Sequence, residues 1–325
     1  MIGLFLVLLV SFLFTYISVP WFIPRLRDAG IVGKDMNKEG YPPVPEMGGL
    51  AIVGGFIVGV LLAIALTTFH LVSFEINLTI VLASLSTVLV MAVIGLIDDL
   101  LRLKQHVKAV LPLFASLPLV AVRAGVTHMT LPFFGTVEFR FLYPLLLVPL
   151  AITGASNATN MLAGFNGLEA GLGVVMCLAV GVIAYLNGSV DAVIISFAML
   201  GGLLAFLRYN WYPAKILIGD IGTLTIGAVV AVSVIIGNIE RVGIILIIPF
   251  FVELFLKLRG RFTHQSWCGI KDGKLVCEKR GDVYGLGRLV MHASGGISER
   301  NLVLTLVGVE SVFAVIAIGL TLFSI

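Results

Sequence analysis

The chain has 325 residues, of which 59% are hydrophobic and only 12% are charged, with a net charge of +3. A soluble domain carries about 25% charged residues, so this composition excludes a surface that faces water on all sides. A basic face with interleaved aromatic residues, the pattern that indicates binding to nucleic acid, does not appear in the sequence. Apolar runs near 20 residues, the length that crosses a bilayer as a helix, predict an all-α polytopic membrane protein.

Ten apolar segments predict ten transmembrane helices in one membrane domain that covers residues 1–325. The segments are 2–23, 48–66, 78–97, 109–122, 141–155, 168–186, 192–207, 216–236, 242–256 and 302–323. The first segment is too long for a signal-peptide core and lacks a basic leading region. It is therefore expected to remain as a span.

Lysine and arginine gather in alternate loops. Of the 21 such residues, all but Arg123, Arg140 and Arg241 fall in one set of loops. The positive-inside rule places that set in the cytoplasm and both termini on the opposite side. The loops of this set are 24–47, 98–108, 156–167, 208–215 and the long loop 257–301.

Two loops predict small β-hairpins. Residues 127–140 alternate apolar and polar side chains around Gly135, as a short antiparallel pair does. Residues 267–279 place Asp272 and Gly273 between two apolar stretches, which is typical of a type I′ turn.

Asp98 and Asp99 lie at the cytoplasmic end of the third predicted span. Acids at a membrane boundary are costly unless they are paired, solvated or bound to a metal. Neighbouring helical residues point about 100° apart, so one acid is expected to face a site while the other orients substrate or a lysine. Lys108 follows closely, and a cation beside carboxylates suits a site for phosphate and a metal. The alternative is a solvated helix end with ordinary basic anchors.

The loop 156–167 contains no lysine or arginine, unlike its neighbours. Asn160 and Asn166 offer amide donors and acceptors, and Gly164 allows a ligand to approach the backbone closely. Asp220 falls a few residues into an apolar run, where a carboxylate needs a counter-charge or a metal. The candidate partners are Lys108 and Lys215.

Arg259 and Arg261 follow the ninth span and are candidates to clamp a phosphate or a sugar, with simple anchoring as the alternative. The acids, the lysine and the amide-rich loop on one face together predict a metal-assisted reaction on a phosphorylated substrate at the membrane surface.

Read in order, the motifs resemble the polyprenyl-phosphate N-acetylhexosamine-1-phosphate transferase superfamily, most closely its eukaryotic and archaeal dolichyl-phosphate branch. The matching stretches are GKDMNK with PEMGG, GLIDDLLRLKQHVK, NATNMLAGFNGLEAG, NWYPAKILIGD and GGISERNLVL. The resemblance implies transfer of N-acetylglucosamine-1-phosphate from UDP-N-acetylglucosamine to dolichyl or another polyprenyl phosphate, with release of UMP. This is the first step of lipid-linked oligosaccharide assembly for N-glycosylation. The histidine-rich motif expected of the muramoyl-pentapeptide branch is absent.

The resemblance also implies roles for single residues. Asn160 and Asp220 would hold Mg²⁺, with Mn²⁺ as the alternative ion, and Lys108 would contact phosphate. Gly164 and Asn166 would receive the uracil end of the nucleotide. The polar centre would be completed by Glu46, Asp98 and Asp99.

Three positions depart from the family pattern. Leu217 stands where an aromatic residue is expected to stack on uracil, and Arg102 stands where asparagine is usual. Arg259 and Arg261 fall where basic residues are expected near the diphosphate and the sugar. Their stretch is Arg-Gly-Arg instead of Arg-His-Arg, and it lies about three residues farther from the Gly-Lys-Leu element at 273–275.

The resemblance implies membrane lipids as partners and is compatible with a homodimer. It places the protein in the plasma membrane of an archaeon or the endoplasmic reticulum membrane of a eukaryote, with a cytoplasmic active site. Three alternatives stay open: transfer of another UDP-acetamido sugar, an intramembrane prenyltransferase, or a transporter. A second Asp-rich cluster, typical of prenyltransferases, is missing, and Glu253 is the main mid-span acid in favour of transport. Direct displacement is favoured over a phospho-aspartyl intermediate on Asp98 or Asp99.

Overall fold

The computed structural model describes residues 2–131, 135–277 and 280–324. Among them, seven helices are long and apolar enough to cross a membrane. The chain is therefore an all-α polytopic membrane protein, as its composition predicts. The seven helices are α1 (Ile2–Asp28), α2 (Gly49–Thr68), α3 (Leu78–Leu101), α8 (Leu168–Leu186), α9 (Val190–Asn210), α10 (Gly219–Ile236) and α14 (Glu299–Ser324).

The other three predicted spans coincide with broken or shorter helices. The fourth, 109–122, covers the end of α4 (Gln105–Val110), and all of α5 (Pro112–Ala115) and α6 (Leu117–Ala121). The fifth consists of a π-helical turn, η1 (Tyr143–Leu147), and α7 (Val148–Met161), and the ninth of α11 (Glu240–Leu246) and α12 (Ile248–Arg259). A proline stands in the first turn of α5, α6 and α12, where its missing N–H interrupts the preceding helix. The total of ten spans stays a prediction.

Helix α10 lies inside the bundle and is the most buried of the seven long helices. It packs against α2, α3, α7, α8 and α9. Close approach explains two glycines here: a Cβ on Gly49 would lie 2.4 Å from the backbone nitrogen of Gly222, and one on Gly227 would lie 2.3 Å from the carbonyl oxygen of Ala155. The start of α10 is thereby held beside the ends of neighbouring helices.

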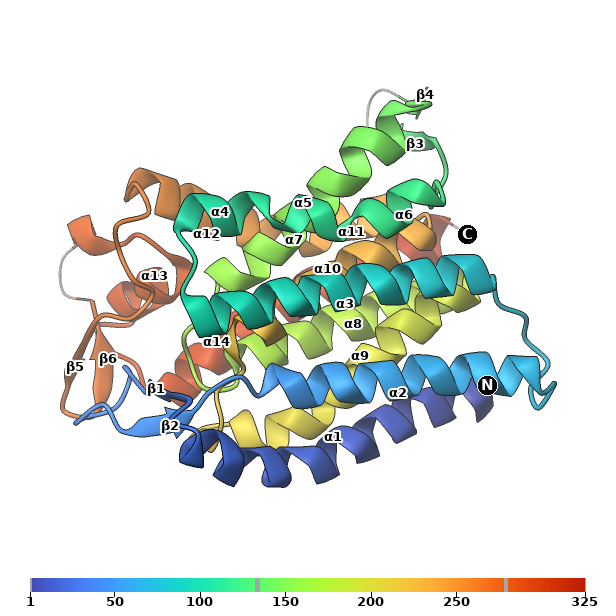
Figure 1. Ribbon diagram of the computed structural model, residues 1–325. Coiled ribbons are helices and arrows are strands. Elements are labelled where there is room, and N and C mark those ends of the chain that lie inside the picture. The colour runs from blue at the N-terminus through green and yellow to red at the C-terminus, as the bar shows by residue number, and fades with distance from the viewer. Residues whose placement is uncertain (1, 132–134, 278–279, 325) are drawn as a thin grey trace.

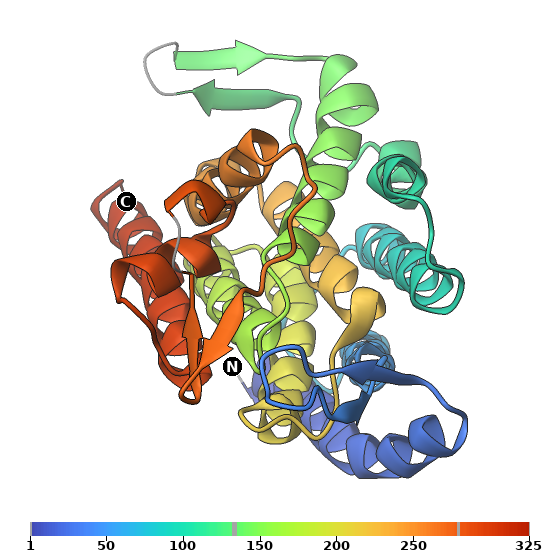
Figure 2. The same ribbon diagram turned by 90° about the vertical axis from the view of Figure 1, so that its left-hand side faces the viewer.

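The two ends of the bundle differ. Both termini and the hairpin of β3 (His128–Leu131) and β4 (Gly135–Glu138) lie at one end (Figure 1). The opposite end carries β1 (Val32–Lys34), β2 (Pro43–Pro45), β5 (Gly269–Lys271), β6 (Lys274–Val276), η2 (Arg280–Asp282) and α13 (Leu286–Ala293), and Figure 2 views the molecule from this side. Termini at a common end agree with the even number of crossings predicted from the loops.

The strands form three antiparallel pairs: β1 with β2, β3 with β4, and β5 with β6. Asp272 and Gly273 join β5 to β6 with φ angles of 51° and 70°, which confirms the predicted type I′ turn. The β3–β4 pair confirms the other hairpin, whose turn at 132–134 lies outside the described residues. The β1–β2 pair was not predicted.

Two predicted boundaries were wrong. The loop expected at 156–167 is helical as far as Met161, because no glycine or proline interrupts the chain before Gly164. Helix α10 begins at Gly219, so Asp220 lies in its first turn and not several residues inside the span. Both corrections place polar side chains at helix ends.

Candidate active site

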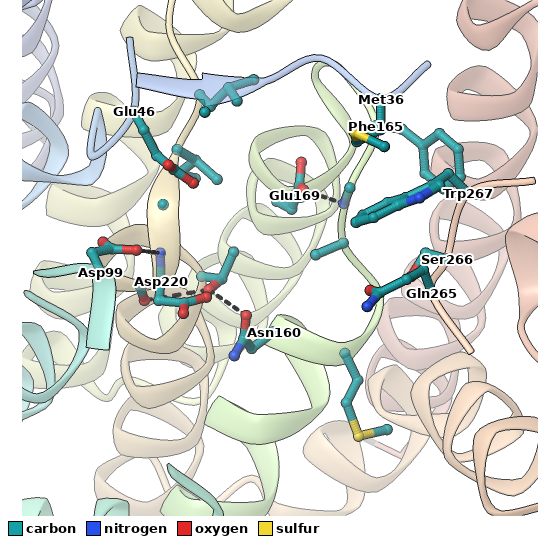
Figure 3. A pocket seen from close by; sticks show the side chains of 18 of the residues that line it. Met36, Glu46, Asp99, Asn160, Phe165, Glu169, Asp220, Gln265, Ser266 and Trp267 are labelled. Atoms are coloured by element: carbon teal, nitrogen blue, oxygen red, sulfur yellow. Dashed lines mark hydrogen bonds between the residues drawn. The ribbon is translucent and has the colours of Figure 1, made fainter. Parts of the chain in front are cut away.

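A cavity of about 830 Å³ opens at the end of the bundle that carries β1, β5 and α13. Its walls come from the β1 region, the ends of α3, α4 and α7, the loop 162–167, the start of α10 and residues 262–267. Glu46, Asp99 and Asp220 lie on one side, and Gln265 and Trp267 on the other (Figure 3). This volume is in the upper part of the range of about 300–1,000 Å³ that is usual for small-molecule sites.

Lys108 is the cation at the centre of the acidic side. Its Nζ lies 2.6 Å from Oδ2 of Asp98 and 2.5 Å from Oδ2 of Asp220, and its side chain is only 14% exposed. Burial alone would lower the pKa of Lys108, but the carboxylates of Asp220 and Asp98 outweigh it and hold that pKa above its ordinary value. The lysine is therefore a fixed positive charge, and Lys108, not Lys215, is the partner of Asp220.

Asp98 and Asp99 point in different directions, as their helical spacing predicts. Asp98 is 4% exposed and also accepts a hydrogen bond from the backbone N–H of Leu103 at 3.0 Å. Asp99 lines the cavity and accepts hydrogen bonds from the N–H groups of Asp220 and Ile221 at 2.7 and 3.0 Å. Its carboxylate thus caps the positive end of the α10 dipole. Asp98 orients the lysine, and Asp99 faces the cavity.

Asn160 lies against Asp220 at the end of α7. With its nitrogen toward Asp220, its amide donates to Asp220 Oδ1 at 2.8 Å and accepts from Lys108 Nζ at 2.9 Å. In the opposite orientation the Asn160 oxygen accepts from Oγ1 of Thr223 at 3.1 Å and faces the Asp220 carboxylate. Two adjacent oxygens of this kind fit a hard divalent cation.

No cluster of three or more His, Cys, Asp or Glu side chains in the described ranges forms a complete metal site. A cation between Asn160 and Asp220 would therefore take its remaining ligands from water and from phosphate oxygens. Mg²⁺ commonly binds in this way, with one or two protein carboxylates. The donor set fits such an ion without further protein ligands.

The loop 162–167 forms the floor of the cavity between α7 and α8. Gly164 has a φ of 110° and donates its N–H to Oε1 of Glu169 at 2.6 Å. Gly167 donates its N–H to Oδ1 of Asn210 at 3.1 Å. Gly164 and Asn166, both predicted from the sequence, line the cavity together with Glu169. The side chains of Glu169 and Asn210 thus hold the backbone of this loop.

Glu46 and Leu217 lie together on the β1 side of the cavity. Leu217 donates its N–H to the carbonyl of Pro45 at 2.7 Å and accepts from the N–H of Gly48 at 2.8 Å. Burial, followed by the negative charge of Asp220, raises the pKa of Glu46 above its usual value, while Arg102 acts in the opposite direction. Leu217 presents an aliphatic side chain to the cavity, as the sequence indicates.

Arg259 and Arg261 are not among the described residues that line the cavity. Arg259 ends α12, donates to the carbonyl of Val283 at 3.3 Å and lies over the ring of Tyr284. The wall at this place is formed by residues farther along the chain: Phe262, His264, Gln265, Ser266 and Trp267. The structure therefore does not bring the expected arginine pair into the cavity.

Buried charges fix this wall in place. Arg288 of α13 donates to the carbonyls of Gln265 and Trp267, both at 2.8 Å. Lys257 donates to Oγ of Ser266 at 3.3 Å. Trp267 lies beside Gly164, where an added Cβ would be 3.5 Å from its ring. The spacing difference before residues 273–275 was the one sequence signal that could have indicated this shift.

Glu253, the main residue in favour of a transporter, is bound to two neighbouring groups of the protein. Its Oε1 lies 3.3 Å from Nζ of Lys257, and its Oε2 accepts from the N–H of Leu286 at 2.6 Å. This acid therefore caps α13 and pairs with a neighbour on α12. It has the contacts of a structural residue.

Comparisons with known proteins agree with the motifs. The model of glycosyl transferase family 4 matches residues 81–238. A protein of Saccharolobus solfataricus is 36% identical over 320 residues, which are 98% of this chain and 96% of that protein. Its provisional name is UDP-N-acetylglucosamine–dolichyl-phosphate N-acetylglucosaminephosphotransferase.

Two further relatives come from other branches of life. A protein of Dictyostelium discoideum with the same name is 29% identical, over 73% of this chain and 67% of its own. The phospho-N-acetylmuramoyl-pentapeptide-transferase of Streptococcus pneumoniae is 31% identical, over 69% of this chain and 70% of its own. The chain thus belongs to glycosyl transferase family 4, the superfamily of polyprenyl-phosphate N-acetylhexosamine-1-phosphate transferases, and is an integral membrane enzyme of this class.

Proposed function

We propose that the protein transfers N-acetylglucosamine-1-phosphate from UDP-N-acetylglucosamine to dolichyl or another polyprenyl phosphate, with release of UMP. The names of its nearly full-length relatives support this activity. The observation that carries it is the position of Lys108 between Asp98 and Asp220, in a cavity at the ends of membrane helices. There a water-soluble nucleotide sugar and a membrane-anchored phosphate can meet.

The acidic side of the cavity suits a diphosphate only together with a cation. Lys108 supplies one positive charge against Asp98 and Asp220, and Asp99 and Glu46 lie nearby. A bound divalent ion, proposed as Mg²⁺ with Mn²⁺ as the alternative, would neutralise phosphate charge when held by Asn160 and Asp220. Asp98 and Asp220 keep Lys108 protonated and aimed into the site, where it positions phosphate.

The remaining walls are proposed to hold the nucleotide and the sugar. The uracil end would lie against the loop 162–167 at Gly164 and Asn166, whose backbone N–H groups are bound to acidic side chains and hold the loop in a fixed shape. Glu46 and Leu217 border that region from the β1 side. In place of Arg259 and Arg261, the wall at Gln265 and Trp267 faces the sugar. Neutral side chains there match an uncharged acetamido sugar.

The proposed reaction is one in-line displacement. An anionic oxygen of the lipid phosphate attacks the β-phosphorus of the nucleotide sugar, and a new P–O bond forms. The bond from that phosphorus to the bridging oxygen breaks, and UMP leaves with the electron pair. No proton has to be removed from the nucleophile, so catalysis consists of positioning and electrostatic stabilisation.

The aspartate contacts favour this route over a phospho-aspartyl intermediate. Asp98 is buried in its bonds to Lys108 and Leu103. Both oxygens of Asp99 accept backbone N–H groups of α10. A carboxylate committed in this way is a poor nucleophile, because attack would first require these bonds to break.

The active site is proposed to face the cytoplasm, because the cavity lies at the end of the bundle where the basic loops gather. UDP-sugars are water-soluble, so this side must be open to a nucleotide pool. The membrane would be the plasma membrane in an archaeon and the endoplasmic reticulum in a eukaryote.

An assay with the purified protein, Mg²⁺ and a panel of UDP-sugars and lipid phosphates tests the proposal. We expect lipid-diphosphate-N-acetylglucosamine and UMP in equal amounts, with UDP-N-acetylglucosamine preferred over other UDP-acetamido sugars. UMP released without a lipid acceptor, or a trapped phospho-enzyme, would show the covalent route. No product with any lipid phosphate would refute the assignment.

A further inference from the structure

A side chain at the start of the last helix, α14, holds the loop 162–167. Glu299 lies in the first turn of α14, and its Oε1 accepts the backbone N–H of Asn166 at 2.8 Å. The Glu299 side chain is only 3% exposed. A carboxylate 133 positions farther along the chain thus fixes the backbone of the loop 162–167.

Three further contacts close a ring around this bond. Oε2 of Glu299 lies 3.0 Å from Nζ of Lys38, and that ammonium lies 2.6 Å from Oδ2 of Asp35. The same Asp35 oxygen accepts from Nδ2 of Asn166 at 2.9 Å. Asn166 is therefore held at its backbone by Glu299 and at its side chain by Asp35, with Lys38 between the two acids.

The ring joins three segments that are remote in sequence. Asn37, next to Lys38, donates its amide to the carbonyl of Gly164 at 2.6 Å, which adds a bond to the same loop. Ile297, two residues before Glu299, pairs with Leu275 of β6, in the hairpin that follows the cavity wall. The start of α14 thus contacts elements from both sides of the cavity.

Burial makes each member of the ring depend on the others. Asp35, Asn166 and Glu299 are 5%, 3% and 5% exposed. Burial alone would lower the pKa of Lys38, but its hydrogen bond to Asp35 and the charge of Glu299 hold that pKa above its ordinary value. Removing the Lys38 ammonium would leave two buried carboxylates without their cation, and removing the Glu299 carboxylate would leave the buried N–H of Asn166 without its acceptor.

We propose that Glu299 is a positioning residue for nucleotide binding, which acts by closing the ring with Asn166, Asp35 and Lys38 and so holds the loop 162–167 in its binding shape. Glu299 does not touch the reacting atoms. The inference rests on the proposed function, because it assigns the loop to the uracil end of a nucleotide sugar. Its expected signature is a loss of nucleotide affinity with little change in the rate of the bound complex.

The test measures UDP affinity by titration calorimetry, and kcat and KM for UDP-N-acetylglucosamine, on the purified full-length protein. Glu299→Ala removes the acceptor and the charge, so we expect the Kd for UDP to rise about 10- to 100-fold, since the binding-competent loop is less populated. KM rises in parallel, and kcat changes by less than about threefold. Glu39→Gln is the matched control. It removes an exposed acid next to Lys38, outside the ring, and should keep wild-type affinity.

A double substitution separates the ring from a general loss of structure. Lys38→Met leaves two buried carboxylates without their cation, whereas Lys38→Met with Glu299→Gln removes opposite charges together. We expect the double variant to bind UDP more tightly than Lys38→Met alone. Provided that the wild-type protein binds UDP, two results would overturn the inference: additive losses of UDP affinity in the double variant, or an unchanged affinity in Glu299→Ala. A wild-type protein that binds no UDP would overturn the proposed function itself, and the inference with it.

Discussion

The two sides of the cavity are built in different ways. On one side Asp98 and Asn160 stand at the ends of α3 and α7, which pack against α10. Asp220 lies in the first turn of α10, and Lys108 reaches it from the short helix α4. On the other side a segment without regular structure, residues 262–267, runs between α12 and β5. Side chains on the first side were located from the sequence, and those on the second side were not.

The difference shows how the position of a side chain is determined. A helix end carries its residues in fixed register, so a shift of one residue turns a side chain by about 100° and removes it from the site. A loop can lengthen or shorten without such a penalty, provided that other contacts hold it. Here Arg288 and Lys257 donate hydrogen bonds to residues 265–267 and hold this segment in place. Gln265 and Trp267 therefore occupy the position expected for the arginines.

The largest expected effect tests the helix-end side. Lys108→Ala removes the cation and leaves Asp98 and Asp220 facing one another, so we expect kcat/KM to fall about 10³-fold or more. Steady-state kinetics at saturating lipid phosphate measure the change. Lys104→Ala, an exposed neighbour on the same side, is the control and should retain nearly full activity. Equal losses in both variants would mean that general basic charge, not this contact, matters.

The next effect concerns the oxygen pair of Asn160 and Asp220. Asp220→Asn removes the charged ligand, so we expect a loss of about 10²-fold in kcat and a higher Mg²⁺ concentration for half-maximal rate. A chelator should abolish turnover of the wild-type protein, and added Mg²⁺ should restore it. An unchanged Mg²⁺ requirement in the variant would place the ion elsewhere.

The loop wall should respond more weakly. Trp267→Ala removes an aromatic face beside Gly164, so we expect KM for the UDP-sugar to rise about 10-fold, with Trp267→Phe close to wild type. The measurement is KM against kcat for both variants. A loss in kcat equal to that of Lys108→Ala would erase the contrast between the two sides.

Glu46 offers a test through stability and pH. The pKa of Glu46 is raised in the folded state, so its protonated form favours folding. This contribution is fully present below the usual pKa of 4.5 and is lost as the pH rises through the folded-state pKa and the carboxyl ionises. Glu46→Gln removes that loss, and we expect its Tm to exceed that of wild type by about 2–4 °C at pH 8. The gain should vanish near pH 4. Thermal unfolding in detergent between pH 4 and pH 8 measures this difference in Tm. A gain in Tm that grows toward low pH would contradict a raised pKa for Glu46.

The smallest effect is expected at the arginine pair, where the sequence departs from the family pattern. Arg261→Ala should change kcat/KM by less than about twofold, since this side chain is exposed and outside the cavity wall. Arg259→Ala loses its contacts to Val283 and Tyr284, which affects stability more than turnover. A 10-fold loss in either variant would restore the arginine pair to the site.

Much of the architecture could be predicted because it depends on local pattern. Apolar runs of membrane length gave most helices within a few residues, and the Asp272-Gly273 turn follows from its positive φ requirement. The broken spans were harder, since Pro112 and Pro249 interrupt helices that composition alone reads as continuous. The helical position of Asn160 was missed for a similar reason, because a polar stretch without a helix breaker looks like a loop.

The sequence by itself determined a polytopic membrane protein with its basic loops in one alternating set, and it identified acids, amides and a lysine that lie in or beside the cavity. Only the tertiary structure decided that Lys108 pairs with Asp98 and Asp220, that residues 262–267 replace Arg259 and Arg261, and that Glu299 reaches Asn166. The physical reason is range. Helix periodicity and turn geometry depend on neighbours in the chain, whereas contacts across more than 100 residues depend on how whole helices pack.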